Sequence, residues 1–225
     1  KVPFVTIGAG NPIPWFEPFH QKGIKCIPVV PNVKLAQRVQ AHGADALVVE
    51  RMEAGGHDGK LTLMALLENV LPDIEIPVIA AGGITDGRGI AASLLMGASG
   101  VQMGTRFLLA EECSLHPKAK DAIMAAADTD SVVTGFTTGD SVRGLKNRFS
   151  DRYLKAEYSG ASPDELSSIS AGTTKRGALF GDTENGFILA GMSLTHLTKI
   201  QSAKEIVEEL VSETERRLAA APGLI

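Results

Sequence analysis

The chain alternates short apolar runs with longer amphipathic segments. The apolar runs have the length of strands and cover residues 2–7, 25–30, 44–49, 77–81 and 100–107. Helical periodicity fills the segments between them, at residues 15–22, 33–42, 61–71 and 87–96. Strand–helix alternation predicts βαβ units and a parallel sheet. The runs are apolar along both faces, as expected for parallel strands that are covered on both sides.

Glycine-rich segments follow two of these predicted strands, at 53–59 (Glu-Ala-Gly-Gly-His-Asp-Gly) and 82–83 (Gly-Gly), and a third, 103–105 (Met-Gly-Thr), lies within the last predicted strand. Glycine lets the backbone approach a ligand without a Cβ in the way. Backbone N–H groups in such turns, together with a following helix N-terminus, can bind an anion. His57 brings a side chain that changes charge near neutral pH. We therefore predict an active-site loop with His57 beside two phosphate-binding turns; a surface loop with an incidental histidine is the alternative.

The order of these motifs suggests a place for the strands in a larger fold. In a (β/α)₈ barrel, the loops after the last two strands frequently bind phosphate. If strands 77–81 and 100–107 are those two, the five predicted strands are strands four to eight. We therefore predict an α/β fold of the TIM-barrel type that lacks its first three βα units ahead of Lys1. A small open α/β sheet, complete in itself, is the alternative.

Beyond residue 107 the pattern changes. Residues 118–127 predict an alanine-rich helix, whereas 128–190 contain few strong apolar runs and a helix near Pro163–Ser170. A segment this long is unusual as an ordinary loop. We predict a helical lid or substrate-side insertion at 128–186, with 1–127 and 187–225 forming the barrel part. Ser202 and Glu205 have the spacing of a capping box and predict the start of a C-terminal helix.

Composition narrows the class of protein. The chain has 225 residues, of which 44% are hydrophobic, and this is enough for one sizeable core. Its 22 basic and 26 acidic residues give a net charge of -4 without a basic block, so a nucleic-acid partner is not expected. The apolar runs are too short for a membrane-spanning helix, and residues 1–8 lack a signal-peptide core. Cys26 and Cys113 do not suggest a disulfide framework, so a cytoplasmic location is expected.

Four motifs are similar to those of a known flavoprotein family. They are 8–12 (Gly-Ala-Gly-Asn-Pro), 53–60, 80–84 (Ala-Ala-Gly-Gly-Ile) and 102–107 (Gln-Met-Gly-Thr-Arg-Phe). Over nearly its whole length the chain resembles the nitronate monooxygenase / 2-nitropropane dioxygenase-like FMN flavoprotein family. Three features are most similar to its FMN-dependent enoyl-acyl-carrier-protein reductase branch: segment 27–33, segment 142–147, and Gly181-Asp182 followed by Ala190-Gly191 and an acidic C-terminal helix. Arg51 departs from that branch, which has glycine beside Met52.

The resemblance implies FMN bound at the carboxyl ends of the barrel strands. It assigns the flavin phosphate to Gly82, Gly83, Gly104 and Thr105. It places Gln102 and Met103 beside the same pocket, Glu50 and Gly55 nearer the ribityl chain and ring, and Asn11 as a further contact.

The resemblance leaves two chemistries and one inactive alternative open. In a reductase, NADH or NADPH reduces FMN, and a trans-2-enoyl thioester is then reduced with His57 as proton donor or oxyanion ligand. In a nitronate monooxygenase, a nitronate is oxidised with O2 and His57 binds or deprotonates the nitro substrate. The third hypothesis is an inactive barrel fragment, whose open edge strands favour assembly with another chain, including a homodimer.

Three cations also receive predictions: Arg143 and Lys146, outside the four motifs, and Arg106, within the 102–107 motif. Arg143 and Lys146 are expected to bind the phosphate of a pantetheine arm or an acidic carrier protein, with a solvated helix face as the alternative. Arg106 is expected to form a structural ion pair with Glu111 or to contact solvent.

Overall fold

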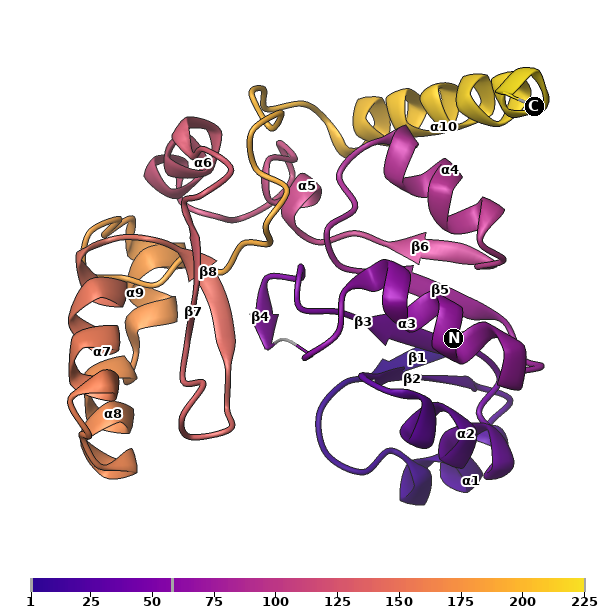
Figure 1. The fold of residues 1–225 in the computed structure, drawn as a ribbon, viewed down its shortest axis with the longest axis horizontal. Coiled ribbons are helices and arrows are strands. Elements are labelled where there is room, and N and C mark those ends of the chain that lie inside the picture. Colours follow the sequence, from indigo (N-terminus) through magenta and orange to yellow (C-terminus); the bar gives the residue numbers. More distant parts are fainter. Residues whose placement is uncertain (1, 58, 225) are drawn as a thin grey trace. The chain divides into compact units, whose positions relative to one another are not determined.

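The computed structural model describes residues 2–57 and 59–224, which form two compact units (Figure 1). The first unit comprises Lys1–Met52, Gly59–Gln102 and Leu210–Ile225, and the second comprises Glu53–Asp58 and Met103–Glu209. Lys1, predicted to lead into the first strand, and Asp58, in the predicted active-site loop, lie outside the described residues. Within the described part of the chain, no helix is long and apolar enough to cross a membrane.

The first unit is built on a five-stranded parallel sheet. Its strands lie in the order β1 (Phe4–Ile7), β2 (Lys25–Val30), β3 (Leu47–Glu50), β5 (Val78–Ala81) and β6 (Gly100–Gln102). The parallel sheet predicted from the sequence is confirmed. Each strand of this sheet is followed along the chain by its neighbour on the same side. Since βαβ crossovers are right-handed, this order places all the connecting helices on one face of the sheet. A barrel has this arrangement, whereas a doubly wound sheet has helices on both faces. Barrel closure and the three preceding βα units stay predictions.

Helices connect these strands at the predicted places. They are α1 (Ile13–His20), α2 (Val33–Ala41), α3 (Leu63–Val70) with the short 3₁₀ turn η1 (Leu71–Asp73), and α4 (Gly87–Leu95). Polar caps begin two of them: Asn32 accepts the N–H of Leu35 in α2, and Asp86 accepts two N–H groups in α4. The C-terminal helix α10 (Ala203–Ala220) begins in the second unit and ends in the first.

The two faces of the sheet differ in exposure. In β2, Cys26, Pro28 and Val30 are buried, whereas Ile27 and Val29 are half-buried. The expectation of strands buried on both faces is therefore right for most of β3 but wrong for β1 and β2. The half-buried face is apolar in β2, which is the composition that the interior of a barrel requires.

The second unit contains a three-stranded antiparallel sheet and several helices. The strands lie in the order β4 (Gly56–His57), β8 (Val142–Leu145) and β7 (Ser131–Thr134). The helices are α5 (Thr105–Leu108), α6 (Pro117–Ala125), α7 (Arg148–Tyr158), α8 (Pro163–Ser170), α9 (Thr173–Phe180) and the first turns of α10. The predicted lid at 128–186 lies wholly inside this unit.

Two sequence-based expectations need correction in this unit. Residues 105–107, predicted as the end of the strand 100–107, form instead the first part of helix α5. The carbonyl of Gly104 accepts the N–H groups of Phe107 and Leu108, which closes the first helical turn. Gly56 and His57, expected in a flexible loop, form the short strand β4. The helix at Pro163–Ser170 is confirmed, and so is the capping box at Ser202, whose N–H and hydroxyl bond Glu205.

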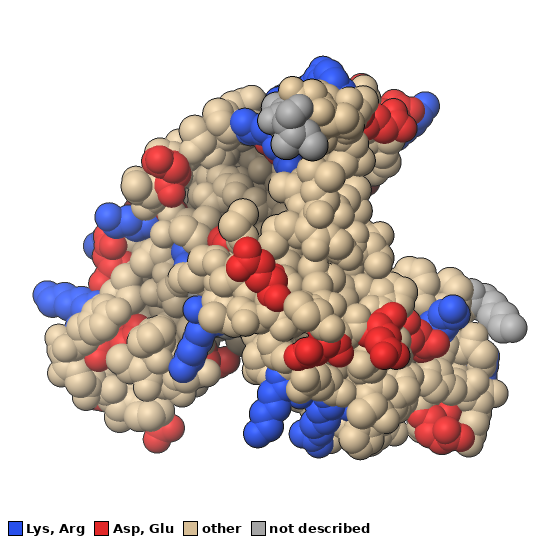
Figure 2. Space-filling view, turned by 45° about the vertical axis from the view of Figure 1, so that its right-hand side comes forward, with Lys and Arg blue, Asp and Glu red and all other residues tan. Residues whose placement is uncertain are grey.

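Apolar contacts hold the second unit together in two clusters. Phe149, Tyr153, Leu166 and Phe187 pack beside the β7–β8 hairpin. A second cluster, which includes Leu145 of β8, joins α6 to the segment after α9. On the face that Figure 2 shows, acidic and basic side chains are interspersed.

Candidate functional site

Several predicted cofactor residues of the first unit meet at one edge of its sheet. Glu50, the last residue of β3, pairs with Ala81 of β5, and Ala81 pairs with Gln102 of β6. Gly82 and Gly83 directly follow Ala81, so these residues share the carboxyl edge of three adjacent strands. Asn11 follows β1 at the same edge, where its side-chain oxygen accepts the N–H of Ile13 at 3.3 Å. Ligands of parallel α/β sheets bind at this edge.

The Gly82–Gly83 turn has a backbone that few other residues could adopt. Both glycines have positive φ, +100° at Gly82 and +72° at Gly83. A residue with a Cβ adopts positive φ only with steric strain, whereas glycine adopts it freely. Turns that contain such residues can aim successive N–H groups at an anion. The turn therefore has the backbone chemistry of a phosphate site.

Gly104 and Thr105 begin α5 in the second unit. A Cβ built on Gly104 would meet nothing within 4 Å, so protein packing does not explain this glycine. The Thr105 hydroxyl accepts the N–H of Gly191 at 2.9 Å, which leaves its own proton to donate. Met103, just before them, is half-buried. These three residues directly follow Gln102 in the chain.

Gly55 owes its small size to protein packing. A Cβ at Gly55 would lie 2.6 Å from the carbonyl carbon of Ala190, and one at Gly191 would lie 2.6 Å from the oxygen of Glu53. The N–H of Met192 also donates to that oxygen at 3.0 Å. The close backbone approach expected at Gly55 is thus to segment 190–192, and its contact with a cofactor stays a prediction.

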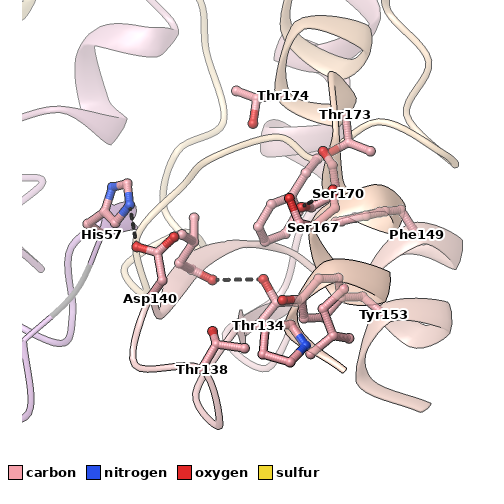
Figure 3. Close-up of a pocket in the computed structure, with 14 residues that line it drawn as sticks. His57, Thr134, Thr138, Asp140, Phe149, Tyr153, Ser167, Ser170, Thr173 and Thr174 are labelled. Carbon is pink, nitrogen blue, oxygen red and sulfur yellow. Dashed lines mark hydrogen bonds and ion pairs between the residues drawn. The ribbon is translucent and has the colours of Figure 1, made fainter. Parts of the chain in front are cut away.

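His57 is held beside an acid that the sequence analysis did not identify. In β4, His57 pairs with Val142 of β8. Its Nε2 lies 3.0 Å from Oδ1 of Asp140, and the two side chains are 74% and 76% exposed (Figure 3). Because a carboxylate only accepts hydrogen bonds, Nε2 is assigned a proton, and Nδ1 is the ring nitrogen left for another contact. The pairing of β4 with β8 brings the two together, and no sequence spacing signals it.

A buried glutamate fixes the loop that carries Asp140. Glu157 of α7 accepts the N–H of Gly135 at 3.2 Å, and the N–H and hydroxyl of Thr137 at 2.8 and 2.9 Å. The positive φ of Gly135, +79°, lets the same loop turn sharply after β7. Glu157 therefore positions Asp140, and through it His57.

Comparison with known proteins decides the family. The model of the nitronate monooxygenase family matches residues 1–213. The chain belongs to the nitronate monooxygenase family. A probable nitronate monooxygenase of Staphylococcus aureus is 34% identical over 205 residues, which cover 86% of this chain and 57% of that protein. The chain thus spans less than two thirds of such curated relatives of the family.

Two solved structures resemble the whole chain. FabK from Thermotoga maritima is 39% identical with a TM-score of 0.95, and the match covers 99% of this chain and 71% of that one. A nitroalkane oxidase from Streptomyces ansochromogenes is 29% identical with a TM-score of 0.82, over 98% of this chain and 66% of that one. The family resemblance predicted from the motifs is confirmed.

Of the three cations with predictions of their own, Arg143 and Arg106 are buried and Lys146 is exposed. Arg143 is buried in β8, where its Nη1 donates to the Ser131 hydroxyl at 3.1 Å, and this favours a structural role over substrate binding. The alternative of a solvated helix face is wrong, since Arg143 lies in a strand; Lys146, just beyond that strand, is exposed. Arg106 is buried and donates to Gln201, so the expected pair with Glu111 is wrong.

Arg51, which replaces the glycine of the reductase branch, is likewise a buried cation. It is fully buried, and its Nη1 donates to the carbonyl oxygen of Pro31 at 3.2 Å. A Cβ on Gly59 would approach this nitrogen at 3.0 Å. The arginine thus links the end of β3 to the end of β2 in the first unit.

Proposed function

We propose that this chain carries the FMN site and catalytic histidine of an FMN-dependent enoyl-acyl-carrier-protein reductase. The observation that carries the proposal is the greater likeness to FabK, at 39% identity and a TM-score of 0.95, than to the nitroalkane oxidase, at 29% and 0.82. The two matches cover nearly the same share of the chain. The motifs 27–33 and 142–147 favour the same branch.

The residues present fit the phosphate end of FMN. Gly82 and Gly83 have the left-handed backbone of an anion-binding turn, and the space above Gly104 is open. Thr105 has a hydroxyl proton to donate. Glu50, Gln102, Met103, Gly55 and Asn11 are the proposed contacts of the remaining cofactor. When bound, FMN would take a hydride equivalent from NADH or NADPH and supply it to the substrate.

His57 supplies the proton in this proposal. Reduction of a trans-2-enoyl thioester adds a hydride at Cβ and a proton at Cα, and negative charge develops on the thioester oxygen between the two steps. For this step His57 would act as the imidazolium: its Nε2–H bonds Asp140, and its Nδ1–H is donated to that oxygen or to Cα, which leaves the neutral ring. Asp140 acts through His57 and is a positioning residue.

One observation favours a second function. Curated relatives at 34% identity are named probable nitronate monooxygenases, and in such an enzyme His57 would bind or deprotonate the nitro substrate. An inactive fragment stays the third hypothesis, because the half-buried face of β2 is apolar. The carrier-protein partner, a homodimer and a cytoplasmic location also stay predictions.

A pair of assays in air separates these functions. The flavin-loaded protein should oxidise NADH or NADPH when crotonyl thioester is added, without matching O2 uptake. Oxygen uptake that depends on an alkyl nitronate and needs no nicotinamide would identify a nitronate monooxygenase instead. A purified protein without yellow colour and without either activity would support the inactive fragment.

A further inference from the structure

The second unit contains a pocket of about 360 Å³ that begins at His57. This volume lies within the range of about 300–1,000 Å³ that small-molecule sites occupy. Helices α7, α8 and α9 and the β7–β8 hairpin form its walls. In Figure 3, His57 and Asp140 lie on one side, with the side chains of these helices across from them. A molecule that fills the pocket would therefore end at the proposed proton donor.

The wall of the pocket combines aromatic surface with hydroxyl groups. Phe149, Leu166 and Phe187 form its apolar part and are buried. Among the described residues, the hydroxyls of Tyr153, Ser167 and Thr174 line the pocket and have no hydrogen-bond partner. The lining therefore offers donors to carbonyl groups and an apolar bed for the chain between them.

Other hydroxyls in the lining are already donors. Ser170 donates to the carbonyl of Ser167 at 3.1 Å, and Thr173 donates to the carbonyl of Ser170 at 2.7 Å. Their oxygens can still accept, so they suit the N–H groups of a ligand. Burial, and then the carboxylates of Glu157 and Asp140, raise the pKa of the Tyr153 phenol. That phenol stays protonated near neutral pH and acts as a donor.

Charge limits what the pocket can hold. Within the described residues, no lysine or arginine lines it, and the carboxylate of Asp140 lies at its His57 end. A dinucleotide would bring a pyrophosphate with no cation to meet it. A plain acyl chain would cover hydroxyl groups without offering them partners, which is costly for polar groups removed from water. The lining instead matches a neutral chain that alternates amides with apolar carbon.

We propose that this pocket binds the pantetheine arm of the thioester substrate, with the thioester end at His57. The inference rests on the proposed reductase function, whose substrates are thioesters. Between its thioester and its terminal phosphate the pantetheine arm is neutral, has two amides and one free hydroxyl, and carries two methyl groups on one carbon. Its two amide carbonyls and its hydroxyl meet Tyr153, Ser167 and Thr174, and its methyl groups pack on Phe149 and Phe187.

Two thioesters that differ in this arm test the proposal in the flavin-loaded protein. Crotonyl-pantetheine should be reduced with a kcat/KM at least about tenfold above that of crotonyl-N-acetylcysteamine, which lacks the outer amide and the methyl groups. Tyr153→Phe, Ser167→Ala and Thr174→Val should each lower this ratio about three- to tenfold, as expected for the loss of one hydrogen bond.

Two matched controls lie on the same helices but outside the pocket. Tyr158→Phe on α7 and Ser168→Ala on α8 remove exposed hydroxyls, and both should leave the ratio unchanged. A ratio that is unaltered in all three pocket variants would overturn the proposal. So would variants that raise only the KM for the nicotinamide, or that alter only the preference for acyl-chain length.

Calorimetric titration with free pantetheine separates the pocket from the reaction. The protein should bind pantetheine, and Tyr153→Phe should weaken the affinity about three- to tenfold, equivalent to one hydrogen bond. If neither thioester is reduced but this binding is observed, the reductase function fails and the pocket assignment stands. If pantetheine does not bind, the pocket assignment fails whatever the thioester assays show.

Discussion

At the scale of single residues, His57 carries the proposed chemistry. Its side chain makes few contacts that stabilise the fold. We predict that His57→Ala lowers kcat/KM about 10²- to 10⁴-fold, the usual contribution of a general acid. Flavin content should be unchanged, because His57 is exposed and its side chain pairs only with Asp140 among the described residues. Steady-state assays and the flavin absorbance of the purified variant measure both.

Asp140→Asn provides a graded companion to that change. It keeps the shape of the loop but weakens the hold on Nε2, so we expect a loss of about tenfold, smaller than that in His57→Ala. Asp151→Asn, on the exposed side of α7, is the matched control and should behave like the wild type. Wild-type turnover in His57→Ala would remove this residue from the mechanism.

Gly104 offers the cleaner test of the phosphate cradle. The Cβ that Gly104→Ala adds meets no protein atom within 4 Å, and alanine tolerates the φ of -107° at this position. The apoprotein should therefore keep its stability. We predict that flavin is lost, because the methyl group would occupy the space of the phosphate. Gly83→Ala would strain the backbone at φ +72° as well, so its effect is less specific. A yellow Gly104→Ala protein with full flavin content would place the phosphate elsewhere.

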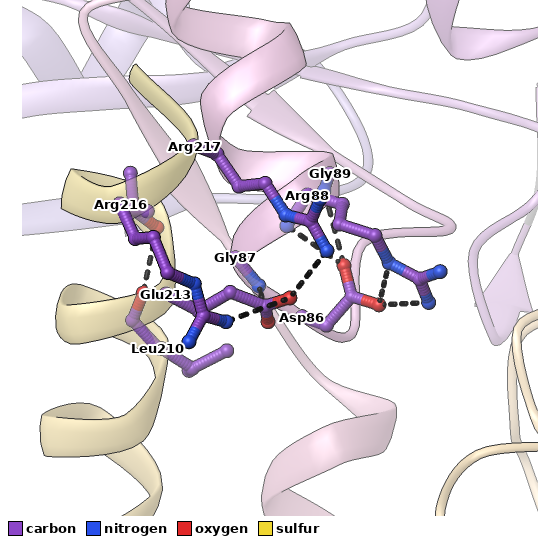
Figure 4. A network of polar contacts seen from close by, with 9 residues as sticks. Asp86, Gly87, Arg88, Gly89, Leu210, Glu213, Arg216 and Arg217 are labelled. Atoms are coloured by element: carbon purple, nitrogen blue, oxygen red, sulfur yellow. Dashed lines mark hydrogen bonds and ion pairs between the residues drawn. The ribbon is translucent and has the colours of Figure 1, made fainter. Parts of the chain in front are cut away.

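At the scale of elements, Asp86 illustrates how a cap is linked to pH. Its carboxylate accepts the N–H groups of Arg88 and Gly89 at 2.9 and 3.1 Å, and it also bonds the Arg88 guanidinium (Figure 4). Burial alone would raise the pKa of Asp86, but these hydrogen bonds outweigh it and lower the pKa below its usual value. The folded state therefore binds the proton less tightly than the unfolded state does.

The sign of this shift gives a prediction. The contribution of Asp86 is complete above the unfolded pKa, about 3.9, and is lost as the pH falls through the lower folded pKa. We expect Asp86→Ala to cost about 1 kcal/mol at pH 7. The difference from the wild type should shrink below about pH 4. Urea unfolding at several pH values measures it, with Asp121→Ala on the exposed side of α6 as control; a difference that grows in acid would contradict the linkage.

Helix α10 depends on the glycine beside that cap. The carboxylate of Glu213 accepts the N–H of Gly87 at 2.9 Å, and Arg217 lies 3.6 Å from its other oxygen (Figure 4). A Cβ on Gly87 would lie 2.6 Å from both the Glu213 Cβ and the Thr214 nitrogen. We expect Gly87→Ala to destabilise the protein by about 1–3 kcal/mol through overpacking, although alanine favours helices.

Gly100→Ala is the matched control for that change, because a Cβ there meets nothing within 4 Å. Thermal unfolding should show a lower Tm for Gly87→Ala and a nearly unchanged Tm for Gly100→Ala. Equal Tm values for Gly87→Ala and the wild type would mean that α10 does not pack on α4 as described.

The elements of the first unit could be predicted from the sequence because each has a strong local signal. Apolar runs, the Asn32 and Asp86 caps and short connections specify the strands and helices within a few residues. The second unit depends on contacts between distant segments. Strand β4 exists only because Gly56 and His57 pair with Arg143 and Val142 of β8, and two residues alone have no strand signal.

At the scale of the whole molecule, the same distinction decides what could be predicted of the site. The residues at the carboxyl edge of the first sheet follow from strand order and glycine positions alone. Asp140 and Glu157 do not, because they reach His57 through tertiary pairing of the second unit. Nor does the sequence show that Arg143 and Arg106 are buried, because burial of a cation depends on tertiary packing and not on its neighbours in the sequence.

The half-reactions of the flavin, followed without oxygen, test the central claim most directly. The account predicts that NADH or NADPH bleaches the FMN of the protein and that crotonyl thioester then restores its colour. In His57→Ala, nicotinamide should still bleach the flavin while the return of colour slows. The account is contradicted if nicotinamide leaves the flavin oxidised and an alkyl nitronate reduces it.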